Sequence, residues 1–193
     1  MKSTINKEFF YKPTLQLAKD LLGCHLVHIT DDLVLSGRIV ETEAYMGPGD
    51  RAAHSFQNRR TKRTEIMFHE PGLIYTYQMH THTLINIVCG EIDSPEAVLI
   101  RALEPIEGIE KMMEFRKNQP ISNLTNGPGK LTKALNITMS SYGKPSWLPP
   151  VYLTEGTKPE HISSGPRIGI DNSGEAKDYP WRFWITGNRF ISR

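Results

Sequence analysis

The chain has 193 residues, of which 38% are hydrophobic and 23% charged, and its formal net charge is +2 at pH 7. This length suits one domain, expected over residues 1–193, and this composition excludes a disordered protein and a coiled coil. No apolar run approaches the ~20 residues that a membrane span needs, and the start, MKSTINKEFF, lacks the apolar stretch of a secretion signal. We therefore expect a cytoplasmic protein without membrane contact, whose cysteines, Cys24 and Cys89, stay reduced.

A helix and two strands are expected in the first part of the chain. The helix starts at Thr14, whose side chain can cap it, and ends at Gly23, with leucines spaced for one buried face. Strands follow over 24–29 and 33–45, and Gly37 marks a bend or bulge in the second strand.

The middle of the chain is predicted to be a long loop followed by a hairpin. Residues 46–68 form the loop, and a loop of this length inside a compact domain is usually functional or disordered. Strands over 73–77 and 84–88 then pair as a protruding hairpin, connected by 78–83. Another buried strand is expected over 97–103.

The later elements are predicted to be short. Helical spacing covers 106–118 and 131–135, and strands are expected over 151–153, 167–170 and 183–185. The sequence contains no internal repeat and no domain linker. Together the elements predict an α+β fold, in which one domain has a mostly antiparallel sheet with helices packed on it.

The strand at 33–45 carries two glutamates among β-branched residues. Because side chains alternate along a strand, one face is expected to hold Ile39, Glu41, Glu43 and Tyr45, and the other Arg38, Val40, Thr42 and Ala44. Burial of a carboxylate is costly, so two of them on one face suggest a functional site. The structural alternative is that one glutamate is exposed while Arg38 or Arg101 pairs with the other.

Arg101 lies inside an otherwise apolar strand and must find an anionic or carbonyl partner if it is buried. A carboxylate beside it would stay ionised and could act as a general base that orients a water molecule. The candidate partners are Glu41 and Glu43. We therefore expect a carboxylate and this arginine to meet at the candidate site.

Aromatic side chains could complete that site. Tyr75 and Tyr77 share one face of their strand, although core packing is the simpler interpretation of these two residues alone. If their face meets Tyr45 and His54, the four rings would form a slot for a flat heterocycle, and they would favour a cationic one.

The tip of the hairpin allows two interpretations. His80 and His82 could offer imidazoles to a metal ion, with His54 as a third ligand, but no cysteine or carboxylate at ligand spacing accompanies them. The other interpretation is a wedge that inserts a side chain into nucleic acid. Basic residues of the long loop could bind phosphate groups at the rim of the site, namely Arg59, Arg60, Lys62 and Arg63.

Several segments resemble the alkyladenine (3-methyladenine) DNA glycosylase family, because they occur in the family's order: GRIVETEAYMGPGDRAAHS, MFHEPGLIYTY, LIRALEP, NGPGKL, RIGI and RFWITG. The resemblance covers residues 8–190 and implies a curved, open-barrel-like antiparallel sheet. It also implies a monomeric, monofunctional glycosylase without metal or other cofactor. Such an enzyme flips an alkylated or deaminated purine out of double-stranded DNA and hydrolyses its N-glycosidic bond. The candidate bases are 3-methyladenine, 7-methylguanine, hypoxanthine and ethenoadenine.

The resemblance assigns three residues to the chemistry. Glu43 matches the glutamate that activates the attacking water. Arg101 matches the arginine that helps to hold this water, and Ile168 matches the residue whose backbone carbonyl contacts it. No lysine nucleophile is required, so the resemblance implies base release without strand cleavage.

The resemblance also assigns the residues that hold the base and the DNA. Tyr45, His54 and Tyr77 match the stacking pocket, and Asn86 matches the asparagine that discriminates against normal guanine. The hairpin departs from the family pattern, since its tip reads QMHTHTLIN. Met79 or His80 would therefore take the position of the wedge that enters the DNA.

Two other functions remain open from the sequence alone. The first is a non-catalytic binder of damaged nucleic acid that uses the same basic rim and wedge. The second is a metal-dependent hydrolase built on His54, His80 and His82. Release of free base from alkylated DNA separates the first from a glycosylase, and sensitivity to a chelator separates the second.

Overall fold

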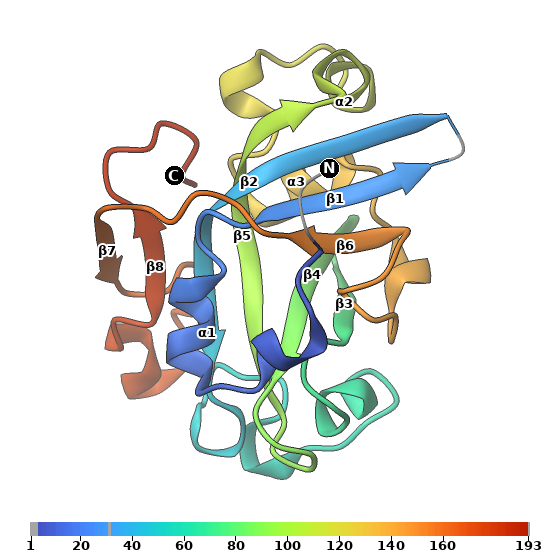
Figure 1. Ribbon diagram of the computed structural model, residues 1–193. Helices are drawn as coiled ribbons and strands as arrows, with labels where there is room; N and C mark the ends of the chain where they lie inside the picture. The colour runs from blue at the N-terminus through green and yellow to red at the C-terminus, as the bar shows by residue number, and fades with distance from the viewer. Residues whose placement is uncertain (1–3, 31, 193) are drawn as a thin grey trace.

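The computed structural model describes residues 4–30 and 32–192, over which eight strands form one antiparallel sheet (Figure 1). The sheet curls into a half-barrel, and three α-helices accompany it in the described part of the chain, so the predicted α+β class is confirmed. The strands are β1 (His25–Thr30), β2 (Leu33–Tyr45), β3 (Ile74–Met79), β4 (His82–Cys89), β5 (Glu96–Glu107), β6 (Val151–Thr154), β7 (Ile162–Gly165) and β8 (Arg182–Ile185). The helices are α1 (Thr14–Asp20), α2 (Ile109–Phe115) and α3 (Pro128–Ala134).

Strand β2 is the strand around which the sheet is organised. The main order of the sheet is β3-β4-β5-β2-β1-β6, and β8 joins it by pairing with β2 and β7. One edge of β2 pairs with β5. Its other edge pairs with β1 over residues 33–38 and with β8 over residues 41–43. Near residue 40, the partner of this edge therefore changes from β1 to β8, and β2 joins β7 and β8 to the other strands of the sheet.

A bulge at Val40 corrects the predicted alternation of β2. In the pairing of β2 with β5, Ile39 lies opposite Leu103 and Glu41 lies opposite Ala102, so Val40 is an extra residue of β2. Such a residue shifts the alternation of a strand by one position. Ile39 consequently packs into the main core, and the prediction that it shares a face with the two glutamates is wrong. Val40 packs instead with Ala102 and Phe190.

Other features of the first part of the chain agree with the sequence in part. A register shift lies between Ser36 and Gly37, so the irregularity predicted at Gly37 is confirmed in position, but the extra residue is Ile106 on β5 and not a residue of β2. The predicted cap at Thr14 is wrong, because Pro13 is the N-cap residue and Thr14 is the first residue of α1. The buried Thr14 hydroxyl donates instead to the Glu96 carboxylate and contacts the Cys89 thiol.

Three predicted boundaries change further along the chain. The hairpin of β3 and β4 has a two-residue turn rather than a connection over 78–83, because Met79 already pairs with His82. Part of the helix predicted over 106–118 continues β5, and Gly108 at φ 76° separates the strand from α2. The helix predicted over 131–135 starts earlier, with Pro128 in its first turn.

The strand predicted over 167–170 is wrong, because those residues form a loop and the preceding strand is β7. None of the described helices is long and apolar enough to cross a membrane.

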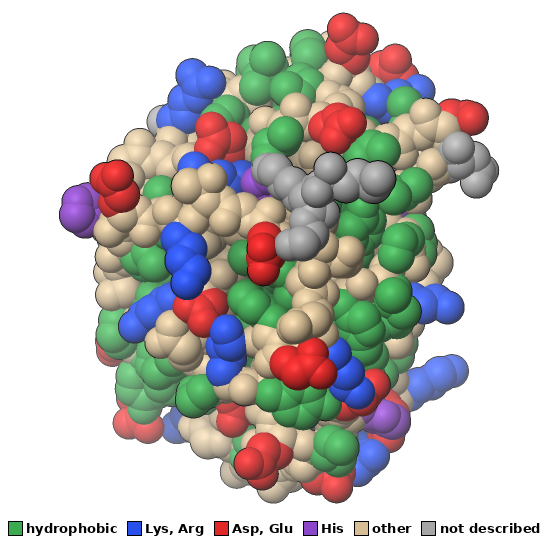
Figure 2. All heavy atoms as spheres, viewed as in Figure 1, with side chains coloured by type: hydrophobic (Ala, Val, Ile, Leu, Met, Phe, Trp, Pro, Cys, Tyr) green, Lys and Arg blue, Asp and Glu red, His purple; other side chains and the backbone are tan. Residues whose placement is uncertain are grey.

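The two faces of the sheet have different surroundings. One face packs on the helices, in a core that includes Ile74, Ile85, Ile87, Val98 and Ile100 from the sheet and Leu17, Met112 and Leu131 from the helices. Figure 2 shows the molecule from the side of α1, where acidic and basic side chains are intermixed as on an ordinary solvated surface. Because side chains alternate, Tyr75, Asn86 and Arg101 point to the opposite face of the sheet.

Candidate active site

A cavity of about 310 Å³ lies on the sheet face opposite the helices. Strands β2 to β5 form one side of it, through Tyr45, Tyr77, Asn86 and Arg101 among others. The loop at 46–68 adds His54, and the loop after β7 adds residues 168–170. The volume is at the lower end of the range for small-molecule pockets, which suits a single flat heterocycle.

Aromatic side chains meet at this cavity, as the sequence predicts. The His54 ring lies edge-on to the Tyr77 ring, with centroids 4.5 Å apart and an interplanar angle of 82°. Its Nδ1 atom is 2.8 Å from the Tyr75 hydroxyl oxygen, and the rings of Tyr75 and Tyr77 lie 5.5 Å apart. The rings of His54 and Tyr77 thus form a corner, and Tyr45 lines the same space.

The imidazole of His54 is neutral over most of the pH range. Burial lowers the pKa of His54 to about 4, and the charges of Arg63 and Arg59 contribute in the same direction. Burial likewise raises the pKa of Tyr77 to about 12. The cavity wall formed by these two side chains therefore carries no charge near neutral pH.

We expect His54 to take up its proton in the folded chain only near pH 4, against an ordinary value of 6.5. Between these values the unfolded chain binds a proton that the folded chain does not, so stability falls as pH falls from 6.5 towards 4. His54→Gln should therefore lose less stability across this window than the wild type. Unfolding midpoints at both ends of the window, with an NMR titration of the imidazole, measure the effect.

Tyr75→Phe is the matched control for this titration. It removes the hydroxyl beside His54 but keeps the burial and both arginines that lower the pKa. The low titration midpoint should persist in this variant. A His54 midpoint near 6.5 in the wild type would contradict the expected neutral wall.

Glu43 is a fully buried carboxylate at the edge of the cavity. Its Oε1 atom accepts a hydrogen bond from the Ile168 backbone N at 2.8 Å and lies 3.2 Å from Arg101 Nη1. Its Oε2 atom accepts from the Tyr45 hydroxyl at 2.9 Å. All three partners line the cavity, so they fix the carboxylate next to any bound molecule.

Glu41 is buried as completely as Glu43 and shares the same arginine. Arg101 Nε is 3.3 Å from Glu41 Oε1, while Arg101 Nη1 faces Glu43. The structural alternative, in which one glutamate is exposed, is therefore wrong. The predicted contact between Arg101 and a buried carboxylate is confirmed, and the arginine bridges two carboxylates rather than one.

A second buried ion pair, which the sequence did not reveal, joins the two loops at the site. Arg167 donates to both oxygens of Asp50, at 2.5 and 2.8 Å, and to the backbone carbonyl of Ala44 at 2.9 Å. Its guanidinium also lies 4.7 Å from the centre of the Tyr45 ring. Residues 167–170 form a loop rather than the predicted strand. The contacts of the Arg167 side chain with Asp50 and Ala44, and not strand pairing, hold the chain here. The Ile168 N–H is thereby directed to Glu43 rather than to a neighbouring strand.

Both wedge candidates lie at the exposed end of the hairpin. Met79 is 49% exposed and lines the cavity, whereas His80 lies in the turn with φ 53°. His82 begins β4 and is exposed as well. The described residues include no group of three or more His, Cys, Asp or Glu side chains that could hold a metal ion.

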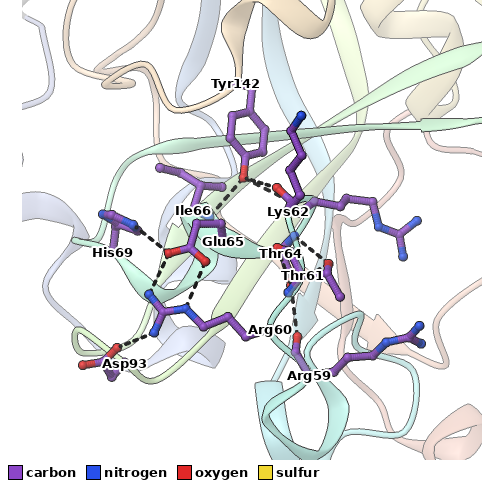
Figure 3. A network of polar contacts seen from close by, with 11 residues as sticks. Arg59, Arg60, Thr61, Lys62, Thr64, Glu65, Ile66, His69, Asp93 and Tyr142 are labelled. Carbon is purple, nitrogen blue, oxygen red and sulfur yellow. Dashed lines mark hydrogen bonds and ion pairs between the residues drawn. The ribbon is translucent and has the colours of Figure 1, made fainter.

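The basic residues of the long loop are divided between two environments (Figure 3). Arg60 pairs with Glu65 at 2.7 Å and with Asp93 at 3.3 Å, and the side chain of Arg59 points away from this cluster. Arg59 and Arg63 line a hollow of about 570 Å³ that also includes His54. The charge of Arg60 is therefore compensated within the protein, while Arg59 and Arg63 border a space beside the cavity.

Comparisons with known proteins give a consistent result. The family model described as methylpurine-DNA glycosylase matches residues 8–189. A Bacillus licheniformis protein is 65% identical over 96% of this chain and 95% of its own length, and a Bacillus subtilis protein is 62% identical over 100% and 98%. A Listeria monocytogenes protein is 50% identical over 100% of this chain and 94% of its own length. All three carry the name "Putative 3-methyladenine DNA glycosylase".

Proposed function

The chain belongs to the methylpurine-DNA glycosylase family, and from this premise we propose that it releases alkylated purines, such as 3-methyladenine, from double-stranded DNA. Family membership makes it a DNA glycosylase, a hydrolase that acts in the repair of alkylated bases. The observation that carries the more specific proposal is the buried Glu43 carboxylate beside a cavity with aromatic walls. We further propose that it acts as a monomer.

The cavity receives the damaged base after the nucleotide has been flipped out of the duplex. Alkylation at N3 or N7 makes the purine cationic, and the faces of Tyr45 and Tyr77 attract a cation. The low pKa of His54 supports this selectivity, because a neutral imidazole does not repel a cationic base. Asn86 lies at the same wall, where its amide donates to the Tyr75 carbonyl, and it discriminates against guanine.

Hydrolysis then needs a water molecule and a group that accepts its proton. Positive charge develops on the sugar as the bond to the base loosens, and the Glu43 carboxylate stabilises this charge while it deprotonates the water. Arg101 and the backbone of Ile168 hold the water against the carboxylate. A cationic purine leaves with little acid help, so the site requires no second acid for such a base.

Met79 or His80 enters the space that the flipped nucleotide leaves in the duplex. The exposed position of both residues at the end of the hairpin supports this role. Met79 lines the cavity, so it lies next to the path of the base. Basic residues of the long loop hold the phosphate backbone of the same strand.

The test is a base-release assay on duplexes that carry 3-methyladenine, 7-methylguanine, hypoxanthine or ethenoadenine. We expect free 3-methyladenine without strand cleavage, and activity that a chelator leaves unchanged. Tight binding without any release of base would identify a non-catalytic binder instead. Loss of activity in the presence of a chelator would contradict the metal-independent mechanism.

The two environments of the basic loop predict different salt effects. Arg59→Gln and Arg63→Gln should each reduce the steepness of log binding constant against log salt concentration by about 1, because each substitution removes one phosphate contact. Arg60→Gln should change the slope less, since Glu65 and Asp93 already compensate its charge. Fluorescence anisotropy with an abasic-site analogue in duplex DNA, over a series of salt concentrations, measures these slopes. Salt-independent binding by the wild type would contradict the role of the loop.

A further inference from the structure

We propose that Glu41 is a positioning residue for base release, which fixes the Arg101 guanidinium relative to Glu43 and balances the charge around it. This inference rests on the proposed function. Glu41 has no exposed surface, and it reaches the cavity through Arg101, which lines the cavity wall. Its effect on the reaction is therefore exerted through the arginine.

Four donor groups converge on the Glu41 carboxylate. Its Oε1 atom lies 3.3 Å from Arg101 Nε and 3.0 Å from Arg182 Nη1, and accepts from the Ser192 hydroxyl at 2.8 Å. Its Oε2 atom accepts from the Ser192 backbone N at 2.5 Å. These donors come from β5, from β8 and from the segment that follows β8. A carboxylate held from three parts of the chain cannot turn freely, so it is a fixed anchor.

The anchor determines how the guanidinium of Arg101 is oriented. Nε faces Glu41, and both Nε and Nη2 lie within 3.3 Å of the Ser192 hydroxyl. Because a guanidinium is planar and rigid, these contacts leave Nη1 directed to Glu43 Oε1. Without Glu41 the guanidinium could turn and pair with both oxygens of Glu43. That pairing would occupy the lone pairs that Glu43 offers to water.

Glu41 also sets the charge of the buried cluster. Glu41 and Glu43 together balance Arg101 and Arg182. The other titratable groups around the site carry no net charge: protonated Tyr45 and Tyr77, neutral His54, and Asp50 paired with Arg167. Loss of the Glu41 charge leaves one excess positive charge beside the sugar on which positive charge develops.

The test is Glu41→Gln, which keeps the shape of the side chain and removes its charge. We expect the single-turnover rate of 3-methyladenine release to fall by about 10²-fold, while binding to an abasic-site analogue is unchanged. The separation of rate from binding is expected because Glu41 has no exposed surface and acts on the reacting groups through Arg101.

Glu104→Gln is the matched control. Glu104 is a carboxylate of β5, it lies 3.9 Å from Arg38 and it is partly exposed. This variant makes the same change of charge away from the site, so its rate and its binding should equal those of the wild type. A variant that only lowered the fraction of folded protein would lower rate and binding together.

Ser192→Ala keeps the charge of Glu41 and removes the hydroxyl that contacts both Glu41 and Arg101. We expect about a tenfold slower release with unchanged binding. A wild-type rate in Glu41→Gln would overturn the inference, and if that variant does not fold, a wild-type rate in Ser192→Ala would overturn it. A wild-type protein that releases no base would instead overturn the proposed function, and this inference with it.

Discussion

Glu43→Gln should slow the release of 3-methyladenine by ~100-fold or more, because it removes the general base of the reaction. The substitution keeps the size of the side chain, and the amide oxygen can still accept from the Ile168 N–H. The cavity and the basic loop are left intact. Binding to duplex DNA with an abasic-site analogue should therefore persist at the wild-type level.

Single-turnover kinetics with excess enzyme measure the chemical step, and anisotropy measures binding. Glu104→Gln provides the control, since it replaces a carboxylate on the neighbouring strand that is distant from the cavity lining. Turnover close to that of the wild type would show that Glu43 is not the base. Loss of both binding and turnover would point to a folding defect, which a melting curve would reveal.

Asp50→Asn should destabilise the fold by roughly 3–5 kcal/mol, because it leaves the Arg167 guanidinium buried beside a neutral amide. Both side chains are fully inaccessible to solvent, so water cannot compensate the lost charge. For a chain of this length the melting temperature should fall by roughly 6–20 °C. Urea unfolding of wild type and variant measures the difference in free energy.

Glu114→Gln is the control for this prediction. It breaks the pair between Lys111 and Glu114 on α2, in which both side chains are exposed. Exposed ion pairs contribute little to stability, so its unfolding midpoint should equal that of the wild type. An Asp50→Asn midpoint equal to that of the control would mean that this buried pair does not hold the two loops together.

The elements that the sequence predicted well are those with a strong local pattern. The bounds of β2, Leu33–Tyr45, are as predicted, because thirteen residues of β-branched and polar character separate two turns. The common face of Tyr75 and Tyr77 also follows from alternation alone. The predicted meeting of these rings with Tyr45 and His54 is confirmed, and so is the predicted contact between Arg101 and Glu43. A buried arginine needs a carboxylate or carbonyl partner, so the residue type alone indicates this contact.

The features that the sequence did not predict depend on contacts between distant residues. Asp50 and Arg167 are 117 positions apart, and no sequence pattern around either residue indicates that the two form a pair. The bulge at Val40 lies where the pairing partner of β2 changes from β1 to β8. The hydrophobic pattern of one strand does not indicate which strands pair with it. The role of Ser192 likewise depends on where the chain returns after β8.

The extra residue at Val40 places Ile39 and Glu41, which are two positions apart, on opposite faces of β2. Without it the two residues would be neighbours, and simple alternation would still place Ile39 in the core and Glu41 on the opposite face. Additional residues at the far end of the hairpin formed by β1 and β2 lengthen only a solvent-facing turn, because pairing with β8 starts at Glu41. Insertions and deletions among relatives of this protein should therefore be tolerated at the far end of this hairpin and at Val40, but excluded between Glu41 and Glu43, where one residue more or fewer would put the two acids on opposite faces.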